Sequence, residues 1–355
     1  MKKILFVGYG SIGTRHVNNI LKSTNHKIII YTKRTDLKSL NNKRIKIFNS
    51  LDEALSENPN VGFVTNETSF HVDTAIKLAK KGLDLFIEKP LSHSMKGIKQ
   101  LETIAKKKKL ITMVGCNMRF YPPLVKIKNY LEKNSLGRII SVQVDSGSFL
   151  PDWHPYEDYR LGYAARKDLG GGIVLTSIHE IDYLHWFFGK VDGAFSITGK
   201  FSDLEVSADD LSAILLKFHN NIVGEVHLDY IQRPYFKSCK IKGTKGILYW
   251  NSDENLVKIF DYEKKIWKII FNAKNHILSS PKQSNYMYKK ELSHFLKCID
   301  QRKETINSVS NAVKSLEIAL AIKKSSELKK IRCMFWTNGW TRKTYVVFKI
   351  TKTNL

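Results

Sequence analysis

A glycine-rich segment near the N-terminus is the first group of residues whose spacing suits a chemical task. Gly8, Gly10 and Gly13 follow the pattern G-x-G-x-x-G between the apolar run Ile4–Val7 and the helix-like segment Ile12–Leu21. After a strand and before a helix, the first glycine permits a tight turn, the second lets the backbone approach a pyrophosphate, and the third allows close helix–strand packing. The pattern predicts a dinucleotide site, with a ligand-free turn as the alternative. The expected contacts are Gly8, Gly10, Ser11, Ile12 and Gly13.

The residues that would face the ribose of this dinucleotide are basic. About 20 residues beyond the last glycine, an NAD site usually offers an acidic side chain to the ribose hydroxyls. Thr32, Lys33 and Arg34 stand there instead, and the nearest acid is Asp36. A hydroxyl group and two cations suit a 2′-phosphate, so this segment favours NADP. If both cations are only solvated, the cofactor is NAD.

A lysine at the end of an expected strand is one candidate catalytic residue. Lys89 lies in the tripeptide Glu88-Lys89-Pro90, directly after the apolar run Leu83–Ile87. The carboxyl ends of parallel strands border the crevice in which ligands bind. We therefore expect Lys89 to meet cofactor and substrate together, and to stabilise negative charge that develops on a reacting oxygen.

A histidine on an expected helix is the second candidate. His179 shares a helix face with Thr176 and Asp182, which are three residues away on either side. Oxidation of an alcohol requires removal of its proton while hydride leaves, and histidine has a suitable pKa for that base. Asp182 is expected to orient the ring or to bind substrate. The alternative for a single helical histidine is a structural role.

Residues 152–160 form a dense polar and aromatic segment. Aromatic faces combined with arginine and histidine suit a sugar, or a sugar that carries a phosphate or carboxylate. Trp153 and Tyr159 are expected to contact the substrate, and Arg160 and Arg166 are candidates for binding its anionic group. The alternative is a packing loop with interface aromatics.

The elements that must position these residues alternate in the N-terminal third of the chain. Short apolar runs of strand length are separated by segments with helical spacing, which predicts a parallel sheet covered by helices on both faces. We expect a Rossmann domain at residues 1–120. The expected strands are Ile4–Val7, Ile28–Tyr31, Ile45–Phe48, Val61–Thr65, Leu83–Ile87 and Ile111–Val114.

The pattern of apolar and polar residues changes near residue 120. Several later apolar runs alternate with polar residues, as in an antiparallel sheet with one wet face. We expect an α+β domain with a mostly antiparallel open sheet at residues 121–330, and an apolar tail of unknown role at 331–355. The expected strands are Ile139–Val144, Leu211–Phe218, Ile222–Leu228, Cys239–Ile241 and Ile247–Trp250; the expected helices are 124–131, 173–188, 287–299 and 309–328.

Charge and cysteine content limit the function classes. The 355 residues include 58 basic and 33 acidic side chains, a net charge of +25. The basic residues are spread along the chain, so we expect no nucleic-acid partner; the charge suits an anionic ligand. The four cysteines lack metal or redox spacing, which predicts reduced thiols in the cytoplasm and no metal site. No apolar run is long enough to span a bilayer, so no membrane association is expected.

Taken together, these motifs resemble the Gfo/Idh/MocA family, which includes glucose–fructose oxidoreductases and inositol dehydrogenases. Besides the glycine pattern and Glu-Lys-Pro, residues 66–71 resemble the family's Asn-Pro-Thr-x-x-His loop, with Glu67 where proline is usual. Residues 115–120, the glycines 170–172 with His179–Asp182, and residues 285–288 also resemble family segments. Relatives commonly carry an aspartate at the position of Thr176, which puts the polarisation of His179 in doubt.

The resemblance implies an oxidoreductase that moves hydride between a nicotinamide and a hydroxyl or keto carbon of a sugar, cyclitol or nucleotide-linked sugar. It implies Lys89 and His179 as catalytic residues and a homo-oligomer, dimer or tetramer, formed through the open sheet. A redox-assisted glycosidase or epimerase with tightly bound NAD, and a non-catalytic sensor of the same fold, are the alternatives. The further residues that the resemblance implies are Asn66, Thr68, His71, Glu88 and Asn117 for the cofactor, and Arg119, Thr176, Asp182 and Tyr288 for the substrate.

Overall fold

The computed structural model describes residues 1–34, 42–273, 284–328 and 332–333, and these fall into two compact units. The first unit is Met1–Tyr121, Asp168–Gly170 and Ser280–Leu316, and the second is Pro122–Lys167, Gly171–Ser279 and Glu317–Leu355. Asp36 and most of the predicted tail lie outside the described residues. The sequence-based division assigned residues 121–330 to one domain, whereas here residues 284–316 belong to the first unit.

The first unit is built on a six-stranded sheet in which every neighbouring pair is parallel. The strand order is β3-β2-β1-β4-β5-β6, which is the order of a Rossmann fold and confirms the expected architecture. The continuous apolar runs are explained by burial on both faces. The strands are β1 (Lys3–Val7), β2 (Lys27–Tyr31), β3 (Ile45–Phe48), β4 (Val61–Val64), β5 (Asp84–Ile87) and β6 (Thr112–Val114).

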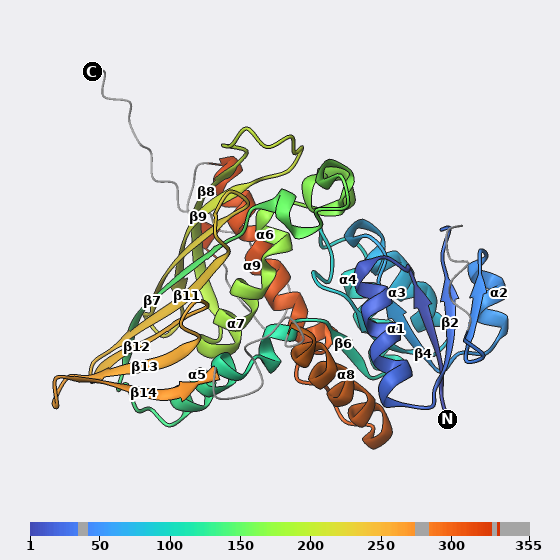
Figure 1. The fold of residues 1–355 in the computed structure, drawn as a ribbon, viewed down its shortest axis with the longest axis horizontal. Helices are drawn as coiled ribbons and strands as arrows, with labels where there is room; N and C mark the ends of the chain where they lie inside the picture. The colour runs from blue at the N-terminus through green and yellow to red at the C-terminus, as the bar shows by residue number, and fades with distance from the viewer. Residues whose placement is uncertain (35–41, 274–283, 329–331, 334–355) are drawn as a thin grey trace. The chain divides into compact units, whose positions relative to one another are not determined.

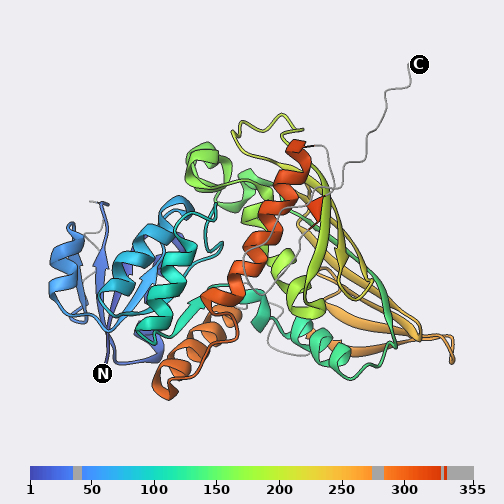
Figure 2. The same ribbon diagram turned by 180° about the vertical axis from the view of Figure 1, so that it is seen from behind.

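Helices cover both faces of this sheet. Figures 1 and 2 show α1 (Ser11–Ser23) on one face and α3 (His71–Lys80) with α4 (Ile98–Lys107) on the other. The short helix α2 (Leu51–Ser56) begins at Ser50, whose side chain accepts a hydrogen bond from the amide of Glu53. Two 3₁₀ turns, η1 (Thr68–Phe70) and η2 (Asn117–Phe120), follow strands β4 and β6.

A helix from late in the chain completes the core of the first unit. α8 (Ser284–Gln301) packs beside α1, and its Leu292, Phe295 and Ile299 join the buried cluster that contains Phe63 and Phe86. The ring centroids of Phe63 and Phe295 are 5.8 Å apart. The next helix, α9 (Val309–Leu328), begins in the first unit and ends in the second.

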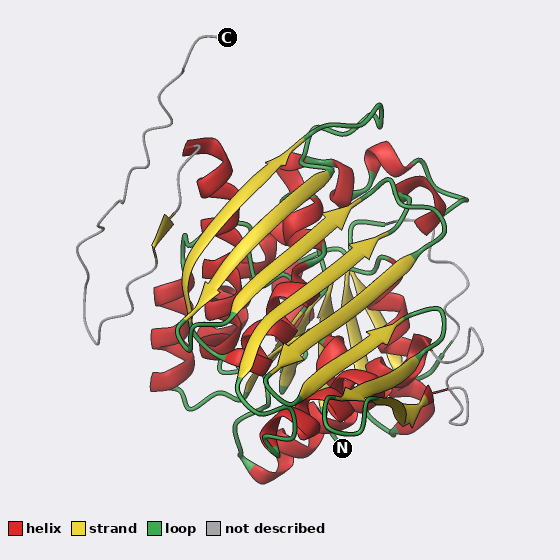
Figure 3. Ribbon diagram, turned by 90° about the vertical axis from the view of Figure 1, so that its left-hand side faces the viewer, coloured by secondary structure: helices red, strands yellow, loops and turns green. Residues whose placement is uncertain are grey.

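The second unit contains a nine-stranded sheet in the order β14-β13-β12-β11-β7-β10-β9-β8-β15. Only the central pair β7–β10 is parallel, so the expected mostly antiparallel sheet is confirmed. Figure 3 shows one face of these strands, and no helix among the described residues crosses it. The strands are β7 (Ile139–Gly147), β8 (Val191–Gly199), β9 (Leu211–Phe218), β10 (Val223–Asp229), β11 (Phe236–Gly243), β12 (Gly246–Asn251), β13 (Leu256–Asp261), β14 (Ile266–Asn272) and β15 (Arg332–Cys333).

Short helices accompany this sheet. The helix predicted over residues 173–188 is interrupted at Ser177, which separates α6 (Ile173–Thr176) from α7 (Ile178–Phe188). The segment before them consists of 3₁₀ turns: η3 (Leu150–Trp153), η4 (Tyr159–Leu161), η5 (Tyr163–Ala165) and η6 (Lys167–Leu169), and α5 (Pro122–Glu132) precedes β7. None of the helices in the described part of the chain is long and apolar enough to cross a membrane.

Candidate functional site

The glycine turn has the geometry that its sequence pattern predicts. Gly8 has φ +98°, and a Cβ there would lie 2.6 Å from the amide nitrogen of Asn66. A Cβ on Gly13 would lie 2.7 Å from the carbonyl oxygen of Gly8, so α1 approaches the turn more closely than any side chain permits. A Cβ on Gly10, in contrast, would meet no atom within 4 Å. Gly8 and Gly13 are therefore required by packing, whereas the space at Gly10 is open.

The N-terminus of α1 offers unpaired donors beside that open space. Gly10 is the N-cap of α1, and no side chain caps it. The first-turn amides of a helix lack intrahelical partners and carry partial positive charge. The first turn, which starts with Ser11 and Ile12, contains no acidic side chain that would repel an anion. These features fit a pyrophosphate.

The proposed phosphate-binding segment follows the neighbouring strand β2. Thr32 is buried, and its hydroxyl accepts a hydrogen bond from the amide of Arg34. The guanidinium of Arg34 lies 3.4 Å from the carbonyl oxygen of Tyr9 and donates to it, so this side chain reaches the glycine turn. Lys33 is exposed. A cation therefore lies at the end of β2 beside the turn.

Lys89 follows β5, and its backbone is fixed by the residue before it. Its amide donates to Glu88 Oε2 at 3.1 Å, while Glu88 Oε1 lies 2.7 Å from His16 Nε2 of helix α1. Glu88 and His16 are both buried. Both carboxylate oxygens of Glu88 are thus engaged within the first unit, which ties α1 to the strand end that carries Lys89. The bond between Lys89 and Pro90 is cis.

His71 connects the loops after β4 and β5. Its ring is buried between two main-chain oxygens, with Nδ1 2.8 Å from the oxygen of Pro90 and Nε2 2.9 Å from that of Asn66. Burial lowers the pKa of His71. A neutral imidazole has one N–H, so it donates one of these two contacts. Asn66 also donates from its amide to the hydroxyl of Thr74, and Thr68 is buried in the adjoining turn.

Two residues expected at the substrate have partners inside the first unit. Arg119 is 5% exposed, and its guanidinium donates to the carbonyl of Ile306 at 2.8 Å. Tyr288 lies on α8 with its ring 4.5 Å from the guanidinium carbon of Arg15. Burial and the nearby Glu88 carboxylate raise the pKa of Tyr288, so its hydroxyl stays protonated at neutral pH. Asn117 is buried in η2.

In the second unit, His179 lies in the first turn of α7, and Asp182 is buried one turn later on the same helix. Thr176 ends α6 and is buried. Glu180, next to His179, is buried and forms an ion pair with Lys237 of β11. The sequence analysis missed this pair, because its two residues are 57 positions apart.

The start of α6 depends on a second ion pair of this unit. Gly172 has φ +106°, and a Cβ there would lie 2.5 Å from the Asp209 carboxylate. That carboxylate accepts from the amide of Val174 and pairs with Lys323 of α9. Gly172 is therefore needed for packing against Asp209. No local sequence pattern indicates Asp209 as the partner, because it lies 35 residues from Val174 in the chain.

Several side chains of the polar and aromatic segment have partners within residues 152–160 or in neighbouring segments. The Arg160 guanidinium pairs with Asp158 at 2.8 Å and with Glu205 at 3.3 Å, although half of its side chain is exposed. Two carboxylates thus offset the charge that was expected to bind a substrate anion. The Tyr159 hydroxyl accepts from the amide of Glu205, and Trp153 donates to Ser148. Arg166 is half-buried.

A parallel six-stranded sheet with this glycine turn defines the class of dinucleotide-binding Rossmann proteins. The chain belongs to the Gfo/Idh/MocA oxidoreductase family: models described as "Oxidoreductase family, NAD-binding Rossmann fold" and "Oxidoreductase family, C-terminal alpha/beta domain" match residues 2–116 and 128–334. The expected family is confirmed, and the protein is a nicotinamide-dinucleotide oxidoreductase.

Curated relatives and solved structures agree with this assignment. Myo-inositol 2-dehydrogenase of Thermotoga maritima is 25% identical over 345 residues, covering 92% of this chain and 97% of the relative. Levoglucosan dehydrogenase of Pseudarthrobacter phenanthrenivorans is 24% identical, but that match spans only 53% of this chain and 54% of the relative. The structure of the WlbA dehydrogenase from Bordetella pertussis, in complex with NADH and UDP-GlcNAcA, has a TM-score of 0.78 at 18% identity, covering 95% of this chain and 98% of that one.

Proposed function

We propose that this oxidoreductase is a dehydrogenase or reductase that acts on a hydroxyl or keto carbon of a sugar, a cyclitol or a nucleotide-linked sugar. The observation that carries the proposal is the glycine turn after β1 together with Lys89 after β5, on the same edge of one parallel sheet. The names of the relatives support the substrate class, since they include an inositol dehydrogenase and a nucleotide-sugar complex.

The proposed chemistry divides between two side chains. The nicotinamide, when bound, accepts or returns the hydride. Lys89 donates a hydrogen bond to the reacting oxygen, where its ammonium stabilises negative charge. His179 removes the hydroxyl proton during oxidation and returns it during reduction. His16 and Glu88 hold the Lys89 backbone, so their part is positioning.

For the cofactor we propose NADP over NAD. Support comes from Arg34, which reaches the glycine turn, and from Lys33 beside it. The other residues proposed for this part of the cofactor site are Gly8, Gly10, Ser11, Ile12, Gly13 and Thr32. Those proposed toward the nicotinamide are Asn66, Thr68, His71 and Asn117.

For the substrate we propose six residues in addition to the two catalytic ones: Trp153, Tyr159, Arg166, Thr176, Asp182 and Tyr288. Arg119 and Arg160 are weaker candidates than the sequence suggested, because one donates to Ile306 and the other pairs with two carboxylates. We also propose a cytoplasmic protein, since Cys116, Cys239 and Cys298 form no disulfide within the described part of the chain.

We further propose a homo-oligomer that covers the open face of the sheet in the second unit. Ile197, Leu215 and Val223 are 57%, 50% and 48% exposed there, on three neighbouring strands. Apolar side chains gathered on one face are typical of a surface that a partner covers.

The test compares the turnover of the wild-type protein with that of a variant that lacks the Lys89 ammonium. Purified protein is screened with NAD, NADP and panels of sugars, cyclitols and nucleotide sugars, and the reduced nicotinamide is followed by absorbance. Lys89→Ala is expected to lower kcat by at least about a hundredfold, because it removes transition-state stabilisation, while cofactor affinity is retained. The control is Lys96→Ala, an exposed lysine in the loop that follows the same strand.

Three outcomes would contradict this assignment. A Lys89→Ala variant with wild-type turnover on the best substrate removes Lys89 from the catalytic set. Cofactor binding with no turnover on any panel favours a sensor of the same fold. Turnover without net release of reduced cofactor would indicate a redox-assisted glycosidase or epimerase.

A further inference from the structure

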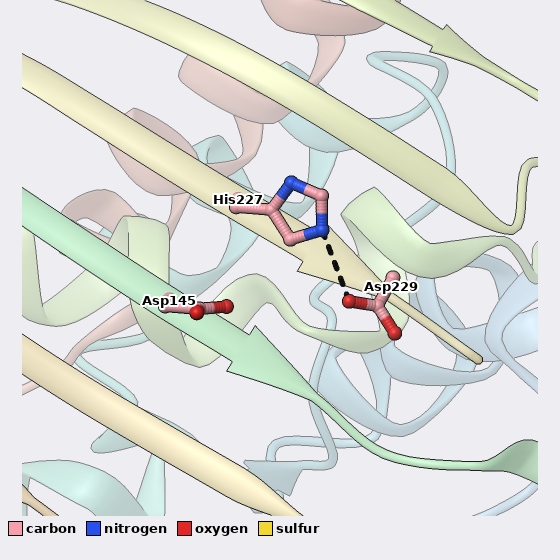
Figure 4. Close-up of side chains that lie close together, drawn as sticks. All are labelled: Asp145, His227 and Asp229. Atoms are coloured by element: carbon pink, nitrogen blue, oxygen red, sulfur yellow. Dashed lines mark hydrogen bonds and ion pairs between the residues drawn. The ribbon is translucent and has the colours of Figure 1, made fainter. Parts of the chain in front are cut away.

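Three side chains that commonly bind metal ions meet on the second unit's sheet, outside the residues proposed for catalysis. Asp145 lies on β7, and His227 and Asp229 lie on the neighbouring strand β10. The two strands run parallel with His227 directly opposite Asp145. Because side chains alternate along a strand, residues 227 and 229 share the face of Asp145. Figure 4 shows the three side chains converging from the two strands.

The spacing of their atoms suits a single small ion. One nitrogen or oxygen from each residue lies within 4.8 Å of the others. His227 Nε2 and Asp229 Oδ2 are 3.0 Å apart, close to the separation of two ligands on one tetrahedral ion. In the metal-bound form the ion would replace the proton that these two atoms share.

Two backbone amides hold the carboxylate of Asp229 in place. Its Oδ1 accepts from the amides of Ile231 and Gln232 at 2.8 and 2.7 Å, which leaves Oδ2 directed at the imidazole. Opposite Asp229 in the register is Gly147, where a Cβ would lie only 2.8 Å from that Oδ2. Hydrogen bonds that orient a ligand oxygen in this way are typical of the outer shell of metal sites.

Asp145 provides an independent observation. Its Oδ1 is buried and has no hydrogen-bond partner among the described residues. A buried carboxylate oxygen without a partner is costly. The cluster therefore has one more carboxylate than its single imidazole can neutralise, and a divalent cation would supply the missing positive charge.

We propose that Asp145, His227 and Asp229 bind one Zn²⁺ ion. An imidazole nitrogen with two carboxylate oxygens suits zinc, whereas Mg²⁺ and Ca²⁺ prefer oxygen ligands alone. Three protein ligands leave a fourth position for water or another ligand. Asp145 and His227 line a hollow of about 540 Å³ on this face, which is also the face proposed for association, so in the oligomer the ion would lie at the contact between copies of the chain.

The experiment measures zinc binding to the full chain by calorimetry and the absorption spectrum of bound Co²⁺ as a substitute. The variants are Asp145→Asn and His227→Gln. The matched control is His219→Gln, because His219 Nδ1 also contacts an aspartate, Asp192 Oδ2 at 2.9 Å. That second pair is flanked by Lys190, and among the described residues no second carboxylate completes a metal-binding group with it.

The expected result is one Zn²⁺ per wild-type chain and a tetrahedral Co²⁺ spectrum. Affinity should fall at least about tenfold in both cluster variants and stay unchanged in His219→Gln. Nicotinamide-cofactor binding checks that each variant is folded, so the result does not depend on a known substrate.

Three results would overturn the proposal: no stoichiometric zinc in the wild type, equal loss in the His219 control, or unchanged affinity in both folded cluster variants. A change in oligomeric state with no zinc binding would instead assign the cluster to an interface between copies of the chain.

Discussion

Glu88 shows how a residue beside a reactive group acts through the backbone. Its two oxygens bind the ring of His16 and the amide of Lys89, and both Glu88 and His16 are buried. The sequence motif predicted that Glu88 would contact the cofactor. The structure shows that its carboxylate joins α1 to β5. No sequence pattern indicated this contact, since the two residues are 72 positions apart and each belongs to a different local motif.

The proposed preference for NADP over NAD is tested by replacing Lys33. Lys33→Ala is expected to weaken NADP binding about tenfold, because a hydrogen bond to a charged group contributes about 1.5 kcal/mol or more. Binding of NAD, which lacks the 2′-phosphate, should not change. Lys27→Ala at the other end of β2 is the control, and calorimetry with both cofactors is the measurement. An equal loss of affinity for both cofactors would show that Lys33 does not bind the 2′-phosphate.

The titration of His227 is a second residue-scale prediction. The hydrogen bond to Asp229 raises the pKa of His227 above 6.5, burial opposes this, and the charges of Asp229 and Asp145 add to the increase. A raised pKa in the folded state means that the pair stabilises the protein below the ordinary histidine pKa, and that this contribution is lost as pH rises through the folded pKa.

NMR titration of the imidazole, with metal removed by a chelator, measures this pKa. Asp229→Asn should lower it toward the ordinary value, and His219→Gln should leave it unchanged. A wild-type His227 that titrates below 6.5 would show that burial outweighs the carboxylates.

At the scale of elements, two glycines of the turn are expected to have different roles: Gly13 allows close packing, and Gly10 leaves space for the cofactor. Gly10→Val is expected to keep the melting temperature, because its Cβ space is open and its φ of −86° suits any residue. The side chain would fill the pyrophosphate path and abolish cofactor binding. Gly13→Val should destabilise the fold itself, by about 1–3 kcal/mol or more, because its Cβ meets the Gly8 carbonyl.

Thermal melting and cofactor titration of the two variants provide the check, each variant serving as the control for the other. If Gly10→Val binds cofactor with wild-type affinity, the pyrophosphate does not pass over this turn.

Strands were predictable from the sequence where burial is complete. The six apolar runs of the first unit became β1 to β6, because both faces of a parallel sheet are covered. β8, β13 and β14 were not predicted. β8 contains two glycines, and β13 and β14 lie toward an edge with side chains that are mostly partly exposed, so their hydrophobic pattern is weak. The break at Ser177 was also not predicted, since the apolar spacing continues across it.

For the candidate site, the sequence predicted which residues belong to it but not which partners those residues have. Motifs located Lys89, His179 and the glycines. They did not reveal that Arg160 is neutralised by Glu205, 45 residues away, or that Arg119 is buried against Ile306. Such partners come from other elements, and spacing within one motif carries no information about them. The zinc cluster was missed for the same reason, because Asp145 and His227 meet only through strand pairing.

At the scale of the whole molecule, association of copies is predicted through the open face of the nine-stranded sheet. Ile197→Glu places a charge among apolar side chains and is expected to shift the protein to a smaller species in light scattering coupled to gel filtration. Met95→Glu, at an exposed apolar residue of the first unit, is the control. A monomeric wild type, or an unchanged mass for Ile197→Glu, would exclude this surface as the contact.

The packing of α8 against α1 has a consequence for how the chain is made. Phe63 and Phe86 stack at 4.8 Å and are covered by Phe295 of α8, a residue near the end of the described chain. At ribosomal speeds, residues 122–301 take on the order of ten seconds or more to synthesise. During that time the nascent Rossmann sheet exposes an aromatic surface that only α8, synthesised later, can cover. Newly made chains are therefore expected to depend on chaperone protection between synthesis of the first unit's sheet and the arrival of α8.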